Sequence, residues 1–311
     1  MFNIVERRHW YFLISALIII PGIVAMVYAT ILFGAPVKRG IDFTGGTLWE
    51  LRFEQPVQPG AVRQVFTDNT LPATVQTTTD DQTILIRTKA MQPDTKQQIG
   101  GALKDSVGAY TELRFEYVGP AVGAEVTRAA GWAVLVAAVF ILLYIIYAFR
   151  KVPNSFRYGL CAIVAMLHDI LVTVGLFSIA GLLLGWEADA LFLTAVLTVV
   201  GFSVQDTIVV YDRIRENIPK RRGEPFETIV NRSLLETLHR SLVTQLNAMF
   251  VMIALLFFGG ATMKQFVAVL LVGMLSGTYS SIFNAVPLVV VWETGKLIGT
   301  VRKPKAQASQ A

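Results

Sequence analysis

Residues 197–217 read Leu197-Thr-Val-Val-Gly-Phe-Ser-Val-Gln-Asp206-Thr-Ile-Val-Val-Tyr-Asp-Arg-Ile-Arg-Glu-Asn217, which places a carboxylate inside an apolar run of helical length. A charged side chain near the centre of a bilayer costs about 2.5–3.5 kcal/mol on insertion scales. We therefore expect Asp206 to have a partner or a function, and Arg240, at the start of the next apolar run, is the candidate partner. The stretch predicts a membrane-spanning helix that carries an ionisable site.

The composition of the whole chain agrees with this prediction. Of its 311 residues, 54% are hydrophobic and only 16% are charged, and the mean hydropathy is +0.55. These values exclude an ordinary soluble domain. Six segments reach the length of about 20 residues that a bilayer requires. These segments are Tyr11–Phe33, Gly131–Phe149, Tyr158–Leu183, Ala190–Tyr211, Leu238–Phe258 and Phe266–Trp292.

Basic residues predict the orientation of the spans, because cytoplasmic loops carry an excess of Lys and Arg. They gather before the first span (Arg7, Arg8), between the second and third (Arg150, Lys151, Arg157), between the fourth and fifth (Arg213, Arg215, Lys220, Arg221, Arg222, Arg232) and after the sixth (Arg302, Lys303, Lys305). The opposite loops hold Glu187 and Asp189, or Lys264 alone. We expect both termini in the cytoplasm. Since topology explains the net charge of +5, no nucleic-acid partner is expected.

This topology divides the chain into five parts. They are a cytoplasmic N-terminus (1–10), a first transmembrane helix (11–33), an extracytoplasmic domain (34–129), a five-helix bundle (130–293) with a basic cytoplasmic loop (212–237), and a basic cytoplasmic tail (294–311). The loop has two open interpretations. It is either an amphipathic element on the membrane face or a solvated helical hairpin.

The extracytoplasmic segment has the pattern of a small α+β domain. Thr47–Phe53 alternates apolar and polar residues as a half-buried strand does, and Leu113, Phe115 and Tyr117 alternate in a last strand. Asp80-Asp81 marks a hairpin turn between two further strands. With two short helices, the order β-α-β-β-α-β predicts a ferredoxin-like domain. The expected fold class is a polytopic α-helical membrane protein with one extracytoplasmic ferredoxin-like domain.

Motifs of soluble enzymes are missing from the sequence. It contains no Walker loop, dinucleotide fingerprint, H-E-x-x-H motif or paired C-x-x-C motifs. No nucleophile with a matched base is evident either. We expect no catalytic site, cofactor or metal, so that any work done by this chain draws on a partner or on an ion gradient.

Polar residues inside the spans are the candidate functional residues. Helical spacing places Ser203, Asp206 and Thr207 on one face of their span, and it places Arg240, Thr244 and Asn247 on one face of the next. Two such faces opposite each other would form a hydrated path. One interpretation is a carboxylate that binds and releases a proton. The other is a structural ion pair with Arg240 extended toward the headgroups.

Two further features lie in the third and sixth spans. His168-Asp169 falls near mid-membrane, as a proton relay or as a hydrogen-bonded pair that tethers neighbouring helices. Gly273-Met-Leu-Ser-Gly277, followed by Ser280 and Ser281, predicts a small-residue face for close helix contact.

Several stretches together resemble the SecD/SecF protein-export subunits, and among them the SecF subunits most closely. The first carries the family signature residues Gly40, Asp42, Gly45 and Gly46 in Gly40-Ile-Asp-Phe-Thr-Gly-Gly-Thr47. The others, in order, are Val118–Val126, His168-Asp169, Asp206–Asn217, Thr237–Thr244 and Phe257–Gly260. The resemblance extends from about residue 10 to residue 295.

The resemblance implies a partner and an energy source. It implies a heterodimer with SecD in the bacterial plasma membrane, related to the resistance-nodulation-division transporters. That pair would associate with the SecYEG channel and use the proton-motive force to promote late translocation of a polypeptide. Asp206 and Arg240 match the family's intramembrane charged pair, and the most critical acid of the relay is expected on SecD. His168, Asp169, Ser203, Gln205, Thr244 and Asn247 would support them, with Gln205 where an Asn is common.

Two alternative functions stay open. One is a half-transporter of the same superfamily for a small molecule or lipid, which would have a larger extracytoplasmic domain than residues 34–129 provide. The other is a non-conducting assembly scaffold.

Overall fold

The computed structural model describes residues 3–77, 81–150, 154–259 and 261–298. The turn expected at Asp80-Asp81 lies partly outside these residues, and so does most of the expected tail 294–311. The chain divides into a helical unit (Met1–Lys38, Ala133–Trp186 and Leu191–Ala311) and an α+β unit (Arg39–Trp132 and Glu187–Ala190).

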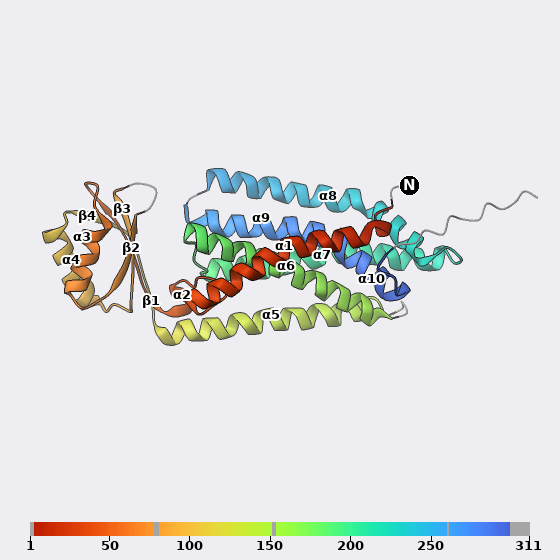
Figure 1. Cartoon of the computed structure of the whole chain (residues 1–311), viewed down its shortest axis with the longest axis horizontal. Coiled ribbons are helices and arrows are strands. Elements are labelled where there is room, and N and C mark those ends of the chain that lie inside the picture. The colour runs from red at the N-terminus through yellow and green to blue at the C-terminus, as the bar shows by residue number, and fades with distance from the viewer. Residues whose placement is uncertain (1–2, 78–80, 151–153, 260, 299–311) are drawn as a thin grey trace, which may run out of the picture. The chain divides into compact units, whose positions relative to one another are not determined.

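Long helices build the helical unit (Figure 1). They are α1 (Arg8–Phe33), α5 (Pro120–Ala148), α6 (Ser155–Leu184), α7 (Ala190–Lys220), α8 (Phe226–Phe258), α9 (Ala261–Ser280) and α10 (Val286–Thr294), with a short 3₁₀ turn, η1 (Val5–Arg7), before α1 and a π-helical turn, η2 (Ser281–Ala285), between α9 and α10. In the described parts of the chain, six helical stretches are long and apolar enough to cross a membrane. The six predicted spans are confirmed.

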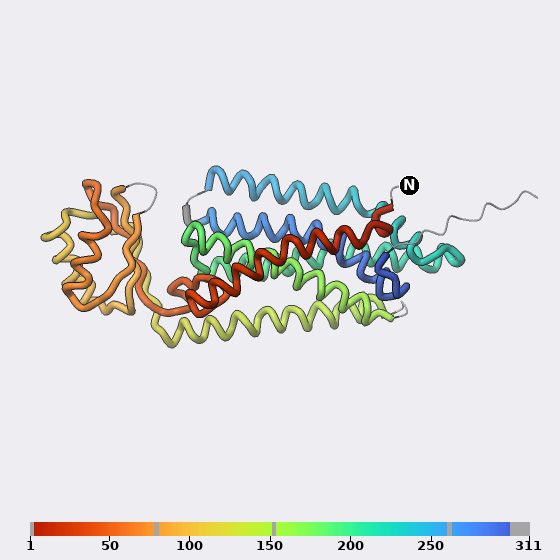
Figure 2. The backbone as a smooth tube through the Cα atoms, viewed as in Figure 1, coloured from red at the N-terminus to blue at the C-terminus, as the bar shows by residue number. Residues whose placement is uncertain are grey.

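The central helices of this unit are α6, α7 and the α9–α10 rod. In each of these helices, about half or more of the residues in the most apolar stretch are buried. In α1, α5 and α8, 17% or less of the residues in the corresponding stretch are buried. Figure 2 shows the backbone of α1 crossing that of α6. At this crossing a Cβ added to Gly175 would lie 2.8 Å from Gly22 Cα. A Cβ on Gly277 would lie 3.2 Å from Ser203 Cα, so the small-residue face of α9 contacts α7 closely, as predicted.

The segment between the fourth and fifth spans is a helical hairpin. Because α7 continues to Lys220 and α8 already begins at Phe226, the chain forms two long helices here rather than an amphipathic element in the membrane plane. Ile214, Val230 and Leu234 are buried in the same apolar cluster as Ile4 and Val5. The hairpin interpretation is therefore correct, and the N-terminal residues pack against it.

Arg8 joins three parts of the chain at this end of the bundle. Its guanidinium is fully buried and donates to Lys296 O at 2.6 and 3.1 Å, to Val5 O at 3.1 Å and to Glu227 Oε1 at 3.2 Å. A buried charge is stable only when it is paired and hydrogen-bonded in this way. The N-terminal turn, the α7–α8 turn and the end of α10 thus lie together (Figure 1). Helix α1 begins at Arg8, three residues before the expected start at Tyr11.

The α+β unit has the predicted ferredoxin-like topology. Its elements are α2 (Ile41–Thr44), β1 (Gly46–Phe53), α3 (Pro59–Asp68), β2 (Ala73–Thr77), β3 (Thr83–Thr88), α4 (Pro93–Ser106) and β4 (Tyr110–Val118). The strands form one antiparallel sheet in the order β2-β3-β1-β4. The fixed φ of Pro59 and Pro93 suits the first helical turns of α3 and α4.

Alternation along β1 places its apolar side chains in the core. Trp49, Leu51 and Phe53 are each 2% exposed or less. The expected alternation of β4 is only partly correct, because Phe115 packs on Trp49 whereas Leu113 is 51% exposed. The register of β4 shifts opposite Glu50 and Leu51 and skips Leu113. An extra residue of this kind, a β-bulge, cannot be read from alternation alone.

The close contact of α1 with α6 gives a testable prediction. Gly175→Leu should lower the thermal unfolding midpoint of the purified protein in detergent, because the new side chain forces the two backbones apart. Overpacking of this kind costs about 1–3 kcal/mol. Gly131→Leu on α5 is the matched control, since a Cβ there has no neighbour within 4 Å. Equal midpoints for the two variants would contradict the observed crossing.

Candidate functional site

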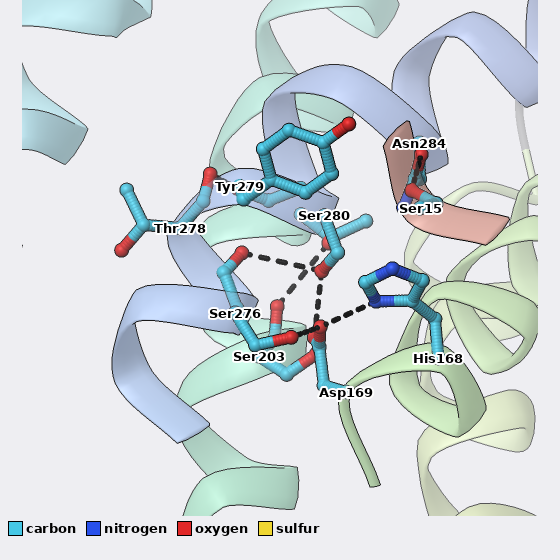
Figure 3. A network of polar contacts seen from close by, with 12 residues as sticks. Ser15, His168, Asp169, Ser203, Ser276, Thr278, Tyr279, Ser280 and Asn284 are labelled. Atoms are coloured by element: carbon cyan, nitrogen blue, oxygen red, sulfur yellow. Dashed lines mark hydrogen bonds and ion pairs between the residues drawn. The ribbon is translucent and has the colours of Figure 1, made fainter. Parts of the chain in front are cut away.

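The carboxylate of Asp169 is the centre of a polar network inside the helical unit (Figure 3). Three serine hydroxyls donate to it: Ser203 of α7 at 2.5 Å, and Ser276 and Ser280 of α9, each at 2.6 Å. Asp169 itself belongs to α6 and is 0% exposed. One side chain thereby joins three of the spanning helices.

His168 completes this network. Its Nδ1 lies 3.0 Å from Asp169 Oδ1, its ring stacks on Tyr279 with centroids 6.2 Å apart, and the residue is 8% exposed. The other ring nitrogen, Nε2, is buried and has no hydrogen-bond partner among the described residues. Tyr279 in turn donates to Tyr11 O at 2.8 Å, which links the network to α1.

Helical spacing explains why α9 can donate twice. Ser276 and Ser280 are four residues apart and therefore lie on one face, with Gly277 between them. Because Gly277 has no side chain, α7 approaches closely enough for Ser203 to reach the same carboxylate. The π-helical turn η2 follows directly after Ser280. Such turns are rare in proteins and occur frequently at functional sites.

Asp206 lies one turn further along α7 and is 5% exposed. Its Oδ2 accepts a hydrogen bond of 2.7 Å from Nε2 of Gln245 on α8. Thr207, beside it, donates to Ser203 O at 3.2 Å. Ser203, Asp206 and Thr207 are all buried on one face of α7, as predicted. Helix α7 contacts Asp169 of α6 through Ser203, and it contacts α8 through its own Asp206.

The expected polar face of α8 exists, but it does not turn toward Asp206 as predicted. Arg240, Thr244 and Asn247 are exposed, and so is Gln205 on α7, whereas the buried polar residues of α8 near Asp206 are Ser241 and Gln245. Across the described residues, no ion pair or hydrogen bond joins Arg240 to Asp206. The helix is turned so that an amide, which costs less to bury than a guanidinium, contacts the acid.

Arg240 instead lines a groove near the turn of the hairpin. The cavity has a volume of about 550 Å³ and is formed by α5, α7 and α8. Its lining includes Tyr144, Ile208, Asp212, Arg213, Glu236 and Arg240. Arg213 is paired with Glu236 at 2.6 Å, whereas Arg240 has no ion pair in the part of the chain that the structure describes.

The signature glycines Gly45 and Gly46 lie beside the start of α5 and the end of β3. Gly45 and Gly46 have φ values of +70° and +133°, which side chains disfavour. A Cβ on Gly45 would lie 2.6 Å from Pro120 Cα, and one on Gly46 would lie 2.8 Å from Thr88 O. Both glycines are therefore required by backbone conformation and by close packing.

Asp42 caps the N-terminus of α7. Its Oδ2 accepts a 2.8 Å hydrogen bond from the backbone N–H of Ala190, the first residue of that helix. Gly40 N donates to Ala188 O at 2.7 Å, and Arg87 of β3 pairs with Glu187 at 2.7 Å. Burial lowers the pKa of Arg87 from its ordinary value and Glu187 opposes that shift. We name these contacts, made by Asp42, Gly40 and Arg87 with residues 187–190, the junction clamp.

Sequence reasoning missed several residues of this site. Gln245 and Tyr279 carry hydrogen bonds or ring contacts that no motif indicated, and Ser276 and Ser280 were expected only as packing residues. The i, i+4 spacing of Ser276 and Ser280 in an apolar span is the signal that could have found them. In the described residues, no group of three or more His, Cys, Asp or Glu could hold a metal ion.

Comparisons with known proteins agree with this architecture. The family model of the protein export membrane protein SecD/SecF, C-terminal, matches residues 98–295, and the SecD/SecF GG motif matches residues 30–57. The protein translocase subunit SecF of Thermobaculum terrenum is 48% identical, over 99% of each chain. That of Anaerolinea thermophila is 46% identical, over 95% of this chain and 96% of the relative.

A solved structure has the same fold. The crystal structure of SecDF, a translocon-associated membrane protein from Thermus thermophilus, superposes with a TM-score of 0.78 at 33% identity. The match covers 94% of this chain and 39% of the SecDF chain. The fold and site define a multi-pass membrane protein of the Sec export machinery. The chain belongs to the SecD/SecF family of protein-export membrane proteins, and its full-length relatives are SecF subunits.

The Asp42 cap gives a prediction for the junction clamp. Asp42→Ala should speed hydrogen–deuterium exchange in the first turn of α7, because the amide of Ala190 loses its acceptor. Loss of such a cap costs about 1 kcal/mol, which corresponds to roughly fivefold faster exchange through local opening. Asp42→Asn keeps an acceptor oxygen and should stay close to wild type. The same exchange rate in Asp42→Ala as in wild type would contradict the cap.

Proposed function

We propose that this chain is the SecF half of a SecD–SecF heterodimer that uses the proton-motive force to promote late steps of polypeptide translocation through the SecYEG channel. One observation carries the proposal: a carboxylate, Asp206, is buried within a spanning helix beside a groove that contains an exposed arginine. Ionisable groups inside membrane spans are functional by default. The SecF relatives and the SecDF fold supply the class of function.

The proposed location is the bacterial plasma membrane, with both termini in the cytoplasm and residues 34–129 outside. Support comes from the bundle end that holds η1, the α7–α8 turn and the end of α10, because Arg7, Lys220 and Arg221 lie there. In the proposed domain organisation, the first transmembrane helix comprises residues 11–33 and the five-helix bundle comprises residues 130–293. Membrane lipids cover the apolar faces that α1 and α5 expose.

Protonation of Asp206 is the proposed switch. As a carboxylate, Asp206 accepts a charge-assisted hydrogen bond from Gln245, and such bonds are stronger than neutral ones. A proton on Asp206 weakens this α7–α8 contact. Arg240 lines the groove with Asp212, which lies six residues or about 9 Å along α7 from Asp206. A partner protein that fills the groove would place one of its own acidic residues beside Arg240, in the same proton path.

Helix α7 offers the route from this switch to the domain outside. It is one uninterrupted helix from Ala190 to Lys220, so Asp206 and the residue capped by Asp42 belong to the same rod. A shift of α7 therefore acts on the junction clamp, and through it on the α+β domain that would contact the emerging polypeptide. Coupling of this kind needs two packings of similar free energy at the α7–α8 contact.

Replacement of Asp206 and of Arg240 tests the function. Asp206→Asn and Arg240→Met should each abolish the gradient-dependent part of export from membrane vesicles and leave the ATP-driven part intact. Asp206→Asn keeps the shape of the side chain but cannot release a proton. The exposed Asp105→Asn on α4 is the matched control and should export as wild type does.

The outcome of that assay also separates the alternatives. Unchanged export in both variants would overturn the mechanism and favour a scaffold. Loss of export only when a small molecule or lipid is withheld from the vesicles would favour a half-transporter.

The groove gives a separate test of the SecD partner. Cys161 is buried and is the only cysteine, so the wild-type protein should not react with a maleimide. Asp212→Cys, in the groove, should be labelled in vesicles that contain this chain alone and protected when SecD is co-expressed. Lys220→Cys, at the turn of the hairpin, is the control and should be labelled equally in both preparations. Equal labelling of both cysteines with SecD present would place the partner elsewhere.

A further inference from the structure

We propose that His168 and Asp169 form a proton-binding site separate from Asp206, in which one proton is held between the imidazole and the carboxyl group. The inference rests on the buried network of α6, α7 and α9 and does not require the proposed function. The inference depends on the balance of charge among the described side chains and not on what the chain transports.

The first argument is the balance of charge around Asp169. The carboxylate is fully buried, and the partners that contact it from α7 and α9 are neutral serine hydroxyls. Hydroxyl donors satisfy lone pairs, but they do not neutralise the charge. A buried ion without a counter-charge is expensive, and ionisable groups avoid this state by taking up a proton. His168, at 3.0 Å, is the neighbour that can carry that proton.

The second argument is the set of charged groups on the surrounding helices. From α1 the backbone O of Tyr11 accepts a hydrogen bond from Tyr279, and from α9 the ring of Tyr279 stacks on His168, so neither contact brings a cationic side chain. Asp206 on α7 is bonded to Gln245 on α8 instead. Among the described residues, no lysine or arginine contacts Asp169. The proton that balances the charge of Asp169 must therefore be held by His168 and Asp169 themselves.

The third argument is the unpartnered nitrogen of His168. An imidazole whose Nδ1 faces a carboxylate can exchange its proton through Nε2. Here Nε2 is buried and has no hydrogen-bond partner among the described residues, and the imidazole ring stacks on Tyr279. A purely structural tether would gain from a bond at this atom, whereas a site that exchanges a proton needs one nitrogen free.

The proton can be located by spectroscopy on the full-length protein in lipid bilayers. Uniform ¹⁵N-histidine labels only His9, His168 and His239, and His168→Gln assigns the signal of interest. At neutral pH we expect solid-state NMR to show His168 as imidazolium in wild type and as neutral imidazole in Asp169→Asn. Ser281→Ala is the matched control, because its buried hydroxyl bonds to Thr278 O and not to Asp169.

Infrared difference spectra complete the test, because they detect a protonated carboxyl. A neutral His168 together with a carboxyl band that disappears in Asp169→Asn would equally support one shared proton. If Asp169→Asn does not fold, His168→Gln should gain this band, since Asp169 must then hold the proton itself. Three outcomes would overturn the proposal: a neutral His168 with no such band, an imidazolium together with the band, or an imidazolium that persists in Asp169→Asn. Unchanged export in Asp206→Asn would refute the proposed function alone.

Discussion

A buried carboxylate in a membrane must find every hydrogen-bond partner inside the protein, because neither lipid nor water supplies one. Asp169 meets this requirement through side chains of three helices, and the helices are positioned accordingly. Two serines one turn apart fix the rotation of α9, and a glycine between them sets its distance from α7. The apolar faces alone would tolerate many rotations, since apolar contacts have no preferred direction. The acid therefore specifies one packing of α6, α7 and α9.

Helix α7 makes contacts near both of its ends and in its middle. Its first residue is held in the α+β unit by Asp42, its middle contacts Asp169 through Ser203 and α8 through Asp206, and its far end forms the hairpin. At that far end the N-terminal residues and Arg8 join α8 and the end of α10.

The sequence could predict the fold because length and periodicity are strong signals, and it located Asp206 because an acid in an apolar run is an anomaly. The sequence could not predict the orientation of α8, because this helix has two polar faces. One contains Arg240, Thr244 and Asn247, and the other contains Ser241 and Gln245, four residues apart. Spacing alone cannot decide which of two such faces turns inward. The β-bulge at Leu113 could not be predicted for a related reason. A residue is recognised as extra only by its pairing with the neighbouring strand.

The exposed polar residues show that the surface of the lone chain is incomplete. Gln205, Thr244 and Asn247 lie in stretches apolar enough to span a membrane, yet their side chains point away from the rest of the chain. An amide in contact with lipid tails has no hydrogen-bond partner and loses free energy relative to water. The groove formed by α5, α7 and α8 carries six charged residues, including Arg240, which has no ion pair among the described residues. These features are costly against lipid but ordinary at a protein–protein contact, so we infer that this face of α7 and α8 is covered by another membrane protein.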